Sequence, residues 1–198
     1  LYGNVAEISS ASALTQSTTY YPSRFYYSLL NQPSSTTASR FIDVTPGDGE
    51  QLNGFGELNG FVHIFKESSI AEMEYTILNL LKLGGDQQVR IRINGFGLYA
   101  SRTLANTGDF YILGTKDGLR LWDTGRKTRL NLEQESRIFT VKVQPIIDKI
   151  IWAGTYKNSV GKYYPKRQWY IFAYEDPDIF PRKQNNSMLV YDFMTNNW

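Results

Sequence analysis

The stretch GLRLWDTGRK, residues 118–127, shows most clearly how this chain is built. Leu119 and Leu121 alternate with polar or small residues, which is the pattern of a β-strand with one buried face. Trp122 and Asp123 follow, and the polar residues after them are typical of a turn. We therefore interpret the stretch as a strand that ends at Trp-Asp and leads into a tight turn.

Similar strand-like runs recur through the chain and are rich in β-branched and aromatic residues. They are RFYYSLL (24–30), RFIDV (40–44), GFVHIFK (60–66), VRIRING (89–95), DFYILGT (109–115), RIFTVKV (137–143), QWYIFAY (168–174) and MLVYDF (188–193). Asn-Gly and Asp-Gly pairs at 59–60 and 117–118 provide the positive φ angles that tight hairpins need. The chain is therefore predicted to be all-β and antiparallel.

Two segments carry a helical pattern, so one or two short helical segments are expected. SIAEMEYTILNLLKLGG (69–85) places apolar residues on one helical face, but its first half also alternates like a strand, and both interpretations stay open. VQPIIDKII (143–151) has Pro145 at a first-turn position. We predict a short helix there, with Ile146, Ile147 and Ile150 facing inwards.

The strand pattern is repeated at long intervals. Corresponding aromatic residues occur at Phe61, Phe110 and Trp169, which are 49 and 59 positions apart. LRLWDTGRK and LVYDFMTNNW also match as an apolar run, an aromatic residue, Asp and a turn. This period is that of one β-propeller blade, although the Gly-His pair of WD40 repeats is missing.

We therefore predict antiparallel β-propeller-like blades, with an unrelated β-sandwich as the alternative. The spacing leaves room for only part of a closed propeller. Residues 1–198 are expected to form a single propeller-like domain that belongs to a longer chain.

Composition excludes several kinds of chemistry. The chain has no Cys and one His, His63, which excludes disulfides, Cys nucleophiles and His-rich zinc sites. The longest apolar runs are far shorter than the roughly 18 residues that a membrane-spanning helix needs. No catalytic, cofactor-binding or metal-binding residue is therefore assigned.

Three weaker sequence patterns each allow both a functional and a structural interpretation. Asp43, Asp48 and Glu50 in DVTPGDGEQ (43–51) could bind Ca²⁺, but the segment lacks the spacing of an EF-hand, and a loop without metal is expected. Glu72 and Glu74 could pair for glycoside hydrolysis, or simply provide surface charge on an outer strand. The aromatic cluster Tyr20, Tyr21, Phe25, Tyr26 and Tyr27 could stack on bases or sugars, or pack between blades.

Charge is distributed unevenly along the chain. Residues 1–100 hold 6 Lys and Arg against 9 Asp and Glu, whereas residues 101–198 hold 15 against 10, so the halves carry −3 and +5. Such basic loops either face a polyanion or are solvated surface. The candidate interface or channel-facing residues are Arg126, Lys127, Arg129, Lys157, Lys162, Lys166, Arg167, Arg182 and Lys183.

Several segments, taken in order, resemble the β-propeller tail proteins of short-tailed bacteriophages. Residues 24–70 are similar to a run in those proteins in which a YYS…P strand precedes an IDV…GDG loop and an NG…FK-x-x-SI hairpin. Residues 111–122, 143–150 and 188–198 also resemble that pattern, whereas residues 71–109 depart from it.

The resemblance implies a structural virion protein of the phage tail rather than an enzyme, with no cofactor. It would form a homo-oligomeric ring, the nozzle or tail-stabilisation ring, that extends the channel for genome ejection below the portal and adaptor proteins. Its partners would be those tail components and, transiently, packaged DNA. The alternatives are a propeller-type carbohydrate-binding module or glycan-degrading enzyme, and a WD-like scaffold.

Overall fold

The computed structural model describes residues 2–10, 16–28, 41–74, 89–124, 136–179 and 185–198, and their strands form four antiparallel sheets. The first sheet contains β1 (Tyr2–Ser10), β2 (Gln16–Tyr26) and β3 (Phe41–Asp43). The second contains β4 (Gly54–Leu58), β5 (Phe61–Phe65), β6 (Ser69–Glu74) and β7 (Val89–Asn94). The third contains β8 (Ala105–Asn106), β9 (Tyr111–Thr115), β10 (Gly118–Trp122) and β11 (Ser136–Ile138). The fourth contains β12 (Val160–Tyr164), β13 (Trp169–Tyr174) and β14 (Ser187–Asp192).

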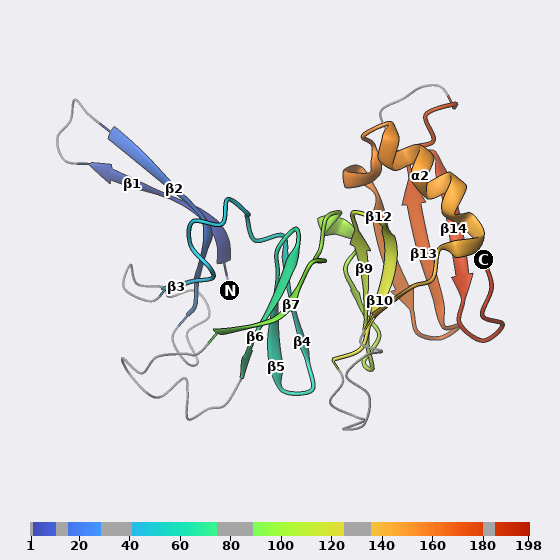
Figure 1. Cartoon of the computed structure of the whole chain (residues 1–198), viewed down its shortest axis with the longest axis horizontal. Coiled ribbons are helices and arrows are strands. Elements are labelled where there is room, and N and C mark those ends of the chain that lie inside the picture. The colour runs from blue at the N-terminus through green and yellow to red at the C-terminus, as the bar shows by residue number, and fades with distance from the viewer. Residues whose placement is uncertain (1, 11–15, 29–40, 75–88, 125–135, 180–184) are drawn as a thin grey trace.

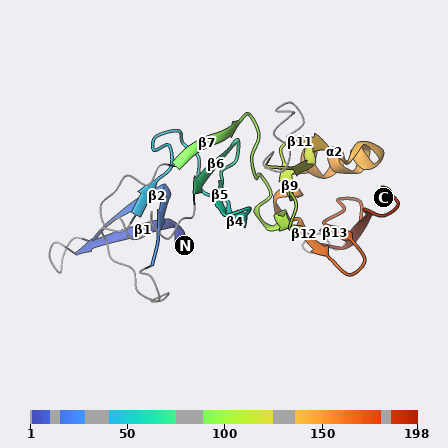
Figure 2. The same ribbon diagram turned by 90° about the horizontal axis from the view of Figure 1, so that it is seen from below.

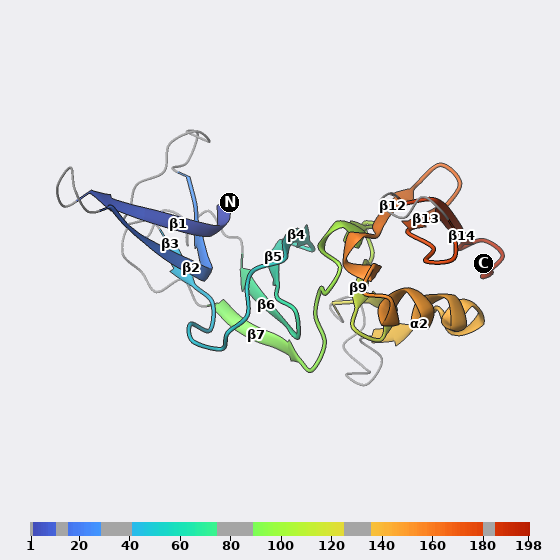
Figure 3. The ribbon, with the colours of Figure 1, turned by 90° about the horizontal axis from the view of Figure 1, so that it is seen from above.

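The four sheets lie side by side in a row that follows the order of the chain (Figure 1). Views from below and from above show the same order, with the first and fourth sheets at opposite ends (Figures 2 and 3). Within each sheet, strands that are consecutive in the chain are neighbours. The all-β, antiparallel prediction is therefore confirmed. Across the described residues the row does not close on itself, so the propeller stays a prediction.

The sequence repeat is a repeat of sheets. The aromatic-rich runs around Phe61, Phe110 and Trp169 form strands β5, β9 and β13, and each of these is the second strand of its sheet. The two runs that end in an aromatic residue and Asp contribute the third strands β10 and β14. Equivalent segments of sequence therefore occupy equivalent places in successive sheets.

The first part of the stretch GLRLWDTGRK (118–127) forms strand β10. The strand ends at Trp122, as predicted, and pairs with β9 on one side and β11 on the other. Gly118 has a φ of 136°, a value that favours glycine, in the hairpin that joins β9 to β10. The turn residues 125–127 lie outside the described residues.

The helical predictions have different outcomes. Helix α2 covers Gln144–Trp152 with Pro145 in its first turn, and Ile147 and Ile150 are fully buried, so the helix predicted over 143–151 is confirmed. The described part of 69–85 is strand β6, and residues 75–88 lie outside the described residues. Three short 3₁₀ helices complete the elements: η1 (Ser101–Thr103), η3 (Val141–Val143) and η4 (Tyr156–Asn158).

Three hydrophobic clusters join consecutive sheets. The first joins Phe25, Val44 and Leu52 to Val62, Ile64, Ala71 and Met73 of the second sheet. The next joins Leu58, Phe65, Ile70 and Leu98 to Tyr111, Leu113 and Trp122 of the third sheet. The last joins Ile112, Leu119 and Leu121 to Tyr170, Phe172 and Tyr191 of the fourth sheet, with Ile147 and Ile150 of α2.

Strand β5 shows how one sheet serves two clusters. Val62 and Ile64 pack toward the first sheet, whereas His63 and Phe65 lie against rings of the third sheet. Successive side chains of a strand point to opposite faces, so this alternation follows directly from the sequence FVHIF. No helix within the described residues is long and apolar enough to cross a membrane.

Candidate functional site

The predicted basic residues do not form one group. Arg126, Lys127, Arg129, Arg182 and Lys183 lie outside the described residues. Lys162, Lys166 and Arg167 are exposed on strand β12 and on the turn that joins it to β13. The Arg167 guanidinium lies 4.9 Å from the centre of the Trp169 ring, which keeps its charge at the surface. This hairpin is therefore the described part of the predicted basic surface.

Lys157 lies apart from that hairpin, in η4. Its Nζ is 3.9 Å from a carboxylate oxygen of Glu67, in the turn between β5 and β6, and 4.2 Å from the centre of the Tyr99 ring. Lys116 contacts the same carboxylate at 3.1 Å. Lys157 is thus partly neutralised by an acidic residue of the second sheet.

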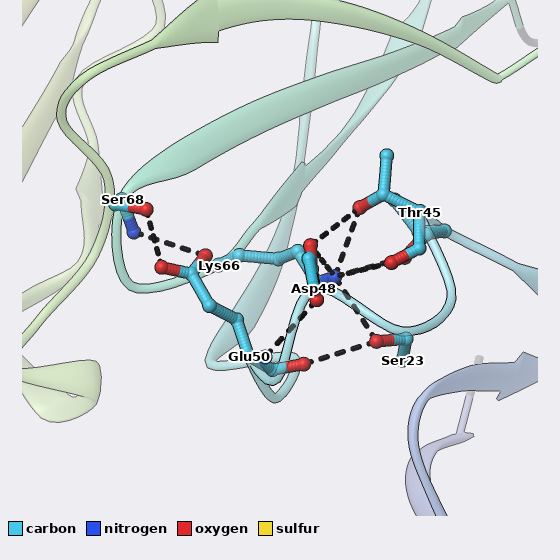
Figure 4. Close-up of polar contacts among 7 residues, drawn as sticks. Ser23, Thr45, Asp48, Glu50, Lys66 and Ser68 are labelled. Atoms are coloured by element: carbon cyan, nitrogen blue, oxygen red, sulfur yellow. Dashed lines mark hydrogen bonds and ion pairs between the residues drawn. The ribbon is translucent and has the colours of Figure 1, made fainter.

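The most developed polar site lies at the junction between the first two sheets and centres on Lys66 (Figure 4). Lys66 directly follows β5, and its side chain is almost completely buried. Its Nζ lies 2.5 Å from Asp48 Oδ2, 2.8 Å from the Val44 carbonyl oxygen, and 3.0 Å from each of the Ser23 and Thr45 hydroxyl oxygens, so its three N–H groups are shared among four acceptors. These acceptors come from β2 and from the loop after β3, so one side chain fastens two sheets together.

The loop that carries Asp48 is shaped to receive the ammonium. Thr45 donates its hydroxyl to Asp48 Oδ2 at 2.7 Å, and the Glu50 amide donates to Asp48 Oδ1 at 3.0 Å. Partial burial alone would raise the pKa of Asp48, but the hydrogen bonds from Lys66, Glu50 and Thr45 outweigh it and hold that pKa below its ordinary value. Asp48 is therefore an anion held opposite a buried cation.

Glu50 makes a second connection across the same junction. Its carboxylate accepts from the Ser68 amide at 3.3 Å and from the Ser68 hydroxyl, just beyond the end of β5. The Glu50 carbonyl accepts from the Ser23 hydroxyl at 3.0 Å. We call Ser23, Thr45, Asp48, Glu50, Lys66 and Ser68 the lysine clamp.

The carboxylates of the acidic loop 43–51 each have a partner within the protein. Asp43 binds Arg24 through two hydrogen bonds of 2.8 and 2.9 Å, Asp48 binds Lys66, and Glu50 binds Ser68. Among the described residues, no three His, Asp or Glu side chains are grouped so as to hold a metal ion. Lys66 thus provides the positive charge opposite Asp48, and whether the loop binds calcium stays a prediction from the sequence.

Ser23 and Lys66 are also the residue types of a Ser-Lys nucleophilic pair, but their geometry opposes that chemistry. A lysine that activates serine must accept a proton from it. Here the Ser23 hydroxyl donates to the Glu50 carbonyl, and it accepts from Lys66 Nζ rather than donating to it. The pair fits a structural role in fastening the sheets.

The junction between the second and third sheets is aromatic. His63 is fully buried, and its Nδ1 and the Tyr111 hydroxyl share a hydrogen bond of 3.0 Å. The His63 ring meets Trp122 edge to face with 5.0 Å between centroids, and Tyr111 stacks on Trp122 at 5.6 Å. Burial, with a smaller contribution from the Glu57 charge, raises the pKa of Tyr111 and keeps its hydroxyl neutral.

His63 is therefore a buried side chain that packs between the second and third sheets. We call His63, Phe65, Tyr111 and Trp122 the aromatic junction, because Phe65 also meets both Tyr111 and Trp122 edge to face. Gly56 in β4 completes the fit, since a Cβ atom there would come within 2.6 Å of the Tyr111 ring.

Two other sequence candidates differ from expectation. Glu72 is buried in β6, opposite His63, so the prediction that it lies on the surface is wrong. The side chain of Glu74 lies outside the described residues. In the tyrosine cluster, Phe25 is buried and meets Phe55 of β4 edge to face, as expected for packing between sheets, whereas Tyr20 is 53% exposed.

The lysine clamp was not identified from the sequence. A lysine after a strand is ordinarily solvated, and the only signal was the order of an Asp-Gly loop and an FK-x-x-SI hairpin in the resemblance described above. No model of a known protein family matches the chain, and no curated protein matches it in sequence. The junctions between sheets are therefore the features on which a function can be proposed.

Proposed function

We propose that this protein is a structural component of the tail of a short-tailed bacteriophage, located in the virion. In this proposal the row of sheets is an arc of β-propeller blades. The protein belongs to the nozzle or tail-stabilisation ring, which continues the genome-delivery channel below the portal and adaptor. Its role is structural, and it needs no cofactor.

The organisation of the sheets supports a propeller arc. Propeller blades are four-stranded antiparallel sheets arranged around an axis, and each blade packs on the next through its faces. The second and third sheets have four strands each, and hydrophobic clusters connect every sheet to the next one in the row. These features are consistent with blades.

The observation that carries the proposal is the location of the lysine clamp. The run 24–70, which most resembles the phage tail proteins, contains both the loop with Asp48 and the hairpin end with Lys66. Two parts of that resemblance are thus joined by an ion pair of 2.5 Å between a buried ammonium and a partly exposed carboxylate. A sequence motif whose separated parts contact each other in the structure supports a shared architecture more strongly than matching residues that lie far apart on the surface.

The distribution of charge also fits a ring. Cyclic assemblies use head-to-tail contacts between two different surfaces of each subunit. The acidic first half and the basic second half of the chain would attract each other across such a contact. If the hairpin with Lys162, Lys166 and Arg167 faces the channel, three scattered cations would attract DNA without holding it tightly, because affinity rises steeply with the number of phosphates neutralised.

The test is the mass of the protein in solution, measured by light scattering after size-exclusion chromatography at low and at high salt, with negative-stain electron microscopy of the peak. A discrete large multiple of the protomer mass and a ring with an axial channel are expected. A monomer at both salt concentrations would overturn the proposal. In that case a glycan-binding screen would examine the exposed Tyr20 region as a carbohydrate-binding surface.

A further inference from the structure

Three charged side chains from separate parts of the chain meet beside the second, third and fourth sheets. Glu67 lies in the turn between β5 and β6, Lys116 lies in the hairpin between β9 and β10, and Lys157 lies in η4, shortly before β12. Lys116 Nζ is 3.1 Å from one carboxylate oxygen of Glu67, and Lys157 Nζ is 3.9 Å from the other. Two ammonium groups therefore share one carboxylate, and the three side chains together carry a surplus of positive charge.

Both lysines are carried by well-defined elements. Lys116 belongs to the tight hairpin turn in which Gly118 has a φ of 136°. The Lys157 ammonium lies 4.2 Å from the centre of the Tyr99 ring, and that ring stacks on the buried Tyr156 ring with 6.2 Å between centroids. The two ammonium groups are thus brought together by the fold, so a ligand that binds them does not first have to order a loop.

The ammonium groups are also accessible from solvent. The side chains of Lys116 and Lys157 are 54% and 53% exposed, and that of Glu67 is 28% exposed. Exposed ion pairs contribute little to stability, because water solvates both charges and the side chains lose conformational freedom on pairing. The Glu67 carboxylate can therefore leave the two lysines at little cost when another anion takes its place.

The other acidic residue of the hairpin has a partner of its own. The Asp117 carboxylate accepts a hydrogen bond of 2.9 Å from the Arg120 guanidinium. Its charge is therefore balanced by Arg120 rather than by the neighbouring Lys116. Glu67 is thus the acidic side chain that balances the two lysines.

We propose that Lys116 and Lys157 form a binding site for a phosphate group, and that Glu67 occupies this site as an internal anion until a phosphate displaces it. A phosphate presents several acceptor oxygens, so it can accept from both ammonium groups at once, as the two carboxylate oxygens of Glu67 do. The phosphate can belong to a nucleic acid backbone or be free inorganic phosphate, because the acceptor oxygens are alike. The site does not require a ring, but backbone binding would show where packaged DNA contacts the proposed tail protein.

The first test measures the affinity for a short labelled DNA duplex by fluorescence anisotropy at several salt concentrations. Glu67→Gln should bind the duplex roughly three- to fivefold more tightly than wild type at low salt, because the lysines no longer have an internal anion. The slope of log affinity against log salt should become steeper by about one in Glu67→Gln. It should become shallower by about one in the double variant Lys116→Met with Lys157→Met.

Asp178→Asn is the matched control for Glu67→Gln. It changes the net charge by the same amount and also removes a carboxylate that pairs with a lysine, Lys149. Duplex binding should be nearly unchanged, because Lys149 keeps Asp176 as a partner at 2.8 Å. Equal gains in affinity for Glu67→Gln and Asp178→Asn would mean that only the net charge matters, and the proposed site would be wrong.

The second test distinguishes the two sources of phosphate. Inorganic phosphate, compared with chloride at the same ionic strength, should raise the thermal unfolding temperature of Glu67→Gln more than that of the double lysine variant. A response to inorganic phosphate without a change in duplex binding assigns the site to free phosphate, and the reverse assigns it to a nucleic acid backbone. If wild type, Glu67→Gln and the double lysine variant respond alike to both probes, the site does not exist. A monomer that binds phosphate here would overturn the proposed ring and leave the site intact.

Discussion

The lysine clamp and the aromatic junction connect neighbouring pairs of sheets, but different forces hold them. At the lysine clamp a buried ammonium and a carboxylate are 2.5 Å apart within a network of hydroxyls and carbonyls. At the aromatic junction four rings pack edge to face or stacked, with one hydrogen bond among them. One row of sheets therefore combines a contact specified by charge with a contact specified by shape.

These two kinds of contact respond to different changes. A buried charge network depends on every partner being present, because removing one leaves the others without compensation. An aromatic contact depends on volume, because a missing ring leaves a cavity that the surroundings fill only partly. A substitution at one junction should therefore leave the contacts of the other junction unchanged.

The largest effect is expected at the aromatic junction. Trp122 is fully buried and contacts His63, Phe65 and Tyr111. Trp122→Ala should lower the free energy of unfolding by about 3–5 kcal/mol, because it removes a large ring and leaves a cavity. Denaturant unfolding monitored by circular dichroism measures this.

Trp152 provides the matched control for that measurement. It is 93% exposed at the end of α2, so Trp152→Ala should change the free energy of unfolding by less than about 0.5 kcal/mol. Equal losses in the two variants would mean that the aromatic junction does not stabilise the fold.

The next largest effect is expected at the lysine clamp. Lys66→Met keeps most of the side-chain volume but removes the ammonium, leaving the Val44 carbonyl and the Ser23 and Thr45 hydroxyls without their donor. The free energy of unfolding should fall by about 2–3 kcal/mol, less than for a fully buried pair because Asp48 is partly exposed. Equilibrium denaturation in urea measures it.

Lys116→Met is the control for the lysine clamp. Lys116 also pairs with a carboxylate, but its side chain is 54% exposed, so its loss should cost about 0–1 kcal/mol. If the two lysine variants are equally stable, the clamp holds the first two sheets no better than a surface ion pair.

The contrast between the junctions also shows what the sequence could predict. Period-two alternation and the Asn-Gly and Asp-Gly turns were sufficient for the strands and hairpins, because both depend on local geometry. The same alternation in FVHIF places His63 on the opposite face of β5 from Val62 and Ile64, where the rings of Tyr111 and Trp122 lie. The aromatic junction was therefore partly visible in the sequence.

The lysine clamp was not visible, because its ion pair joins residues 18 positions apart. Which loop a lysine reaches depends on how one sheet packs on the next, and a single sequence does not contain that information. The surface position predicted for Glu72 was wrong for a related reason. Alternation predicts a solvated face only when one side of a sheet is open, whereas β6 lies in a sheet with neighbours on both sides.

A smaller effect tests the fit of the aromatic junction from its other side. In Gly56→Ala the new Cβ would lie 2.6 Å from the Tyr111 ring, so the ring must shift, at a cost of about 1–3 kcal/mol. In a protein that already carries Tyr111→Leu, Gly56→Ala should lower the free energy of unfolding by less than it does in the wild type, because the ring that the new Cβ would meet is gone. Strictly additive losses in a double-mutant cycle would show that Gly56 and Tyr111 do not interact.

The smallest effect is a dependence on pH in acid that the Asp48 carboxylate gives to the lysine clamp. The pKa of Asp48 lies below its ordinary value of 3.8, so the ionised carboxylate is favoured by folding. Its contribution to stability is then complete above the unfolded pKa and is lost as the pH falls through the folded pKa. Asp48→Asn removes this contribution at all pH values, so wild type should exceed the variant in unfolding free energy at about pH 6 and approach it at about pH 3. A constant difference between wild type and Asp48→Asn across this range would mean that the Asp48 charge contributes nothing to the contact between the first two sheets.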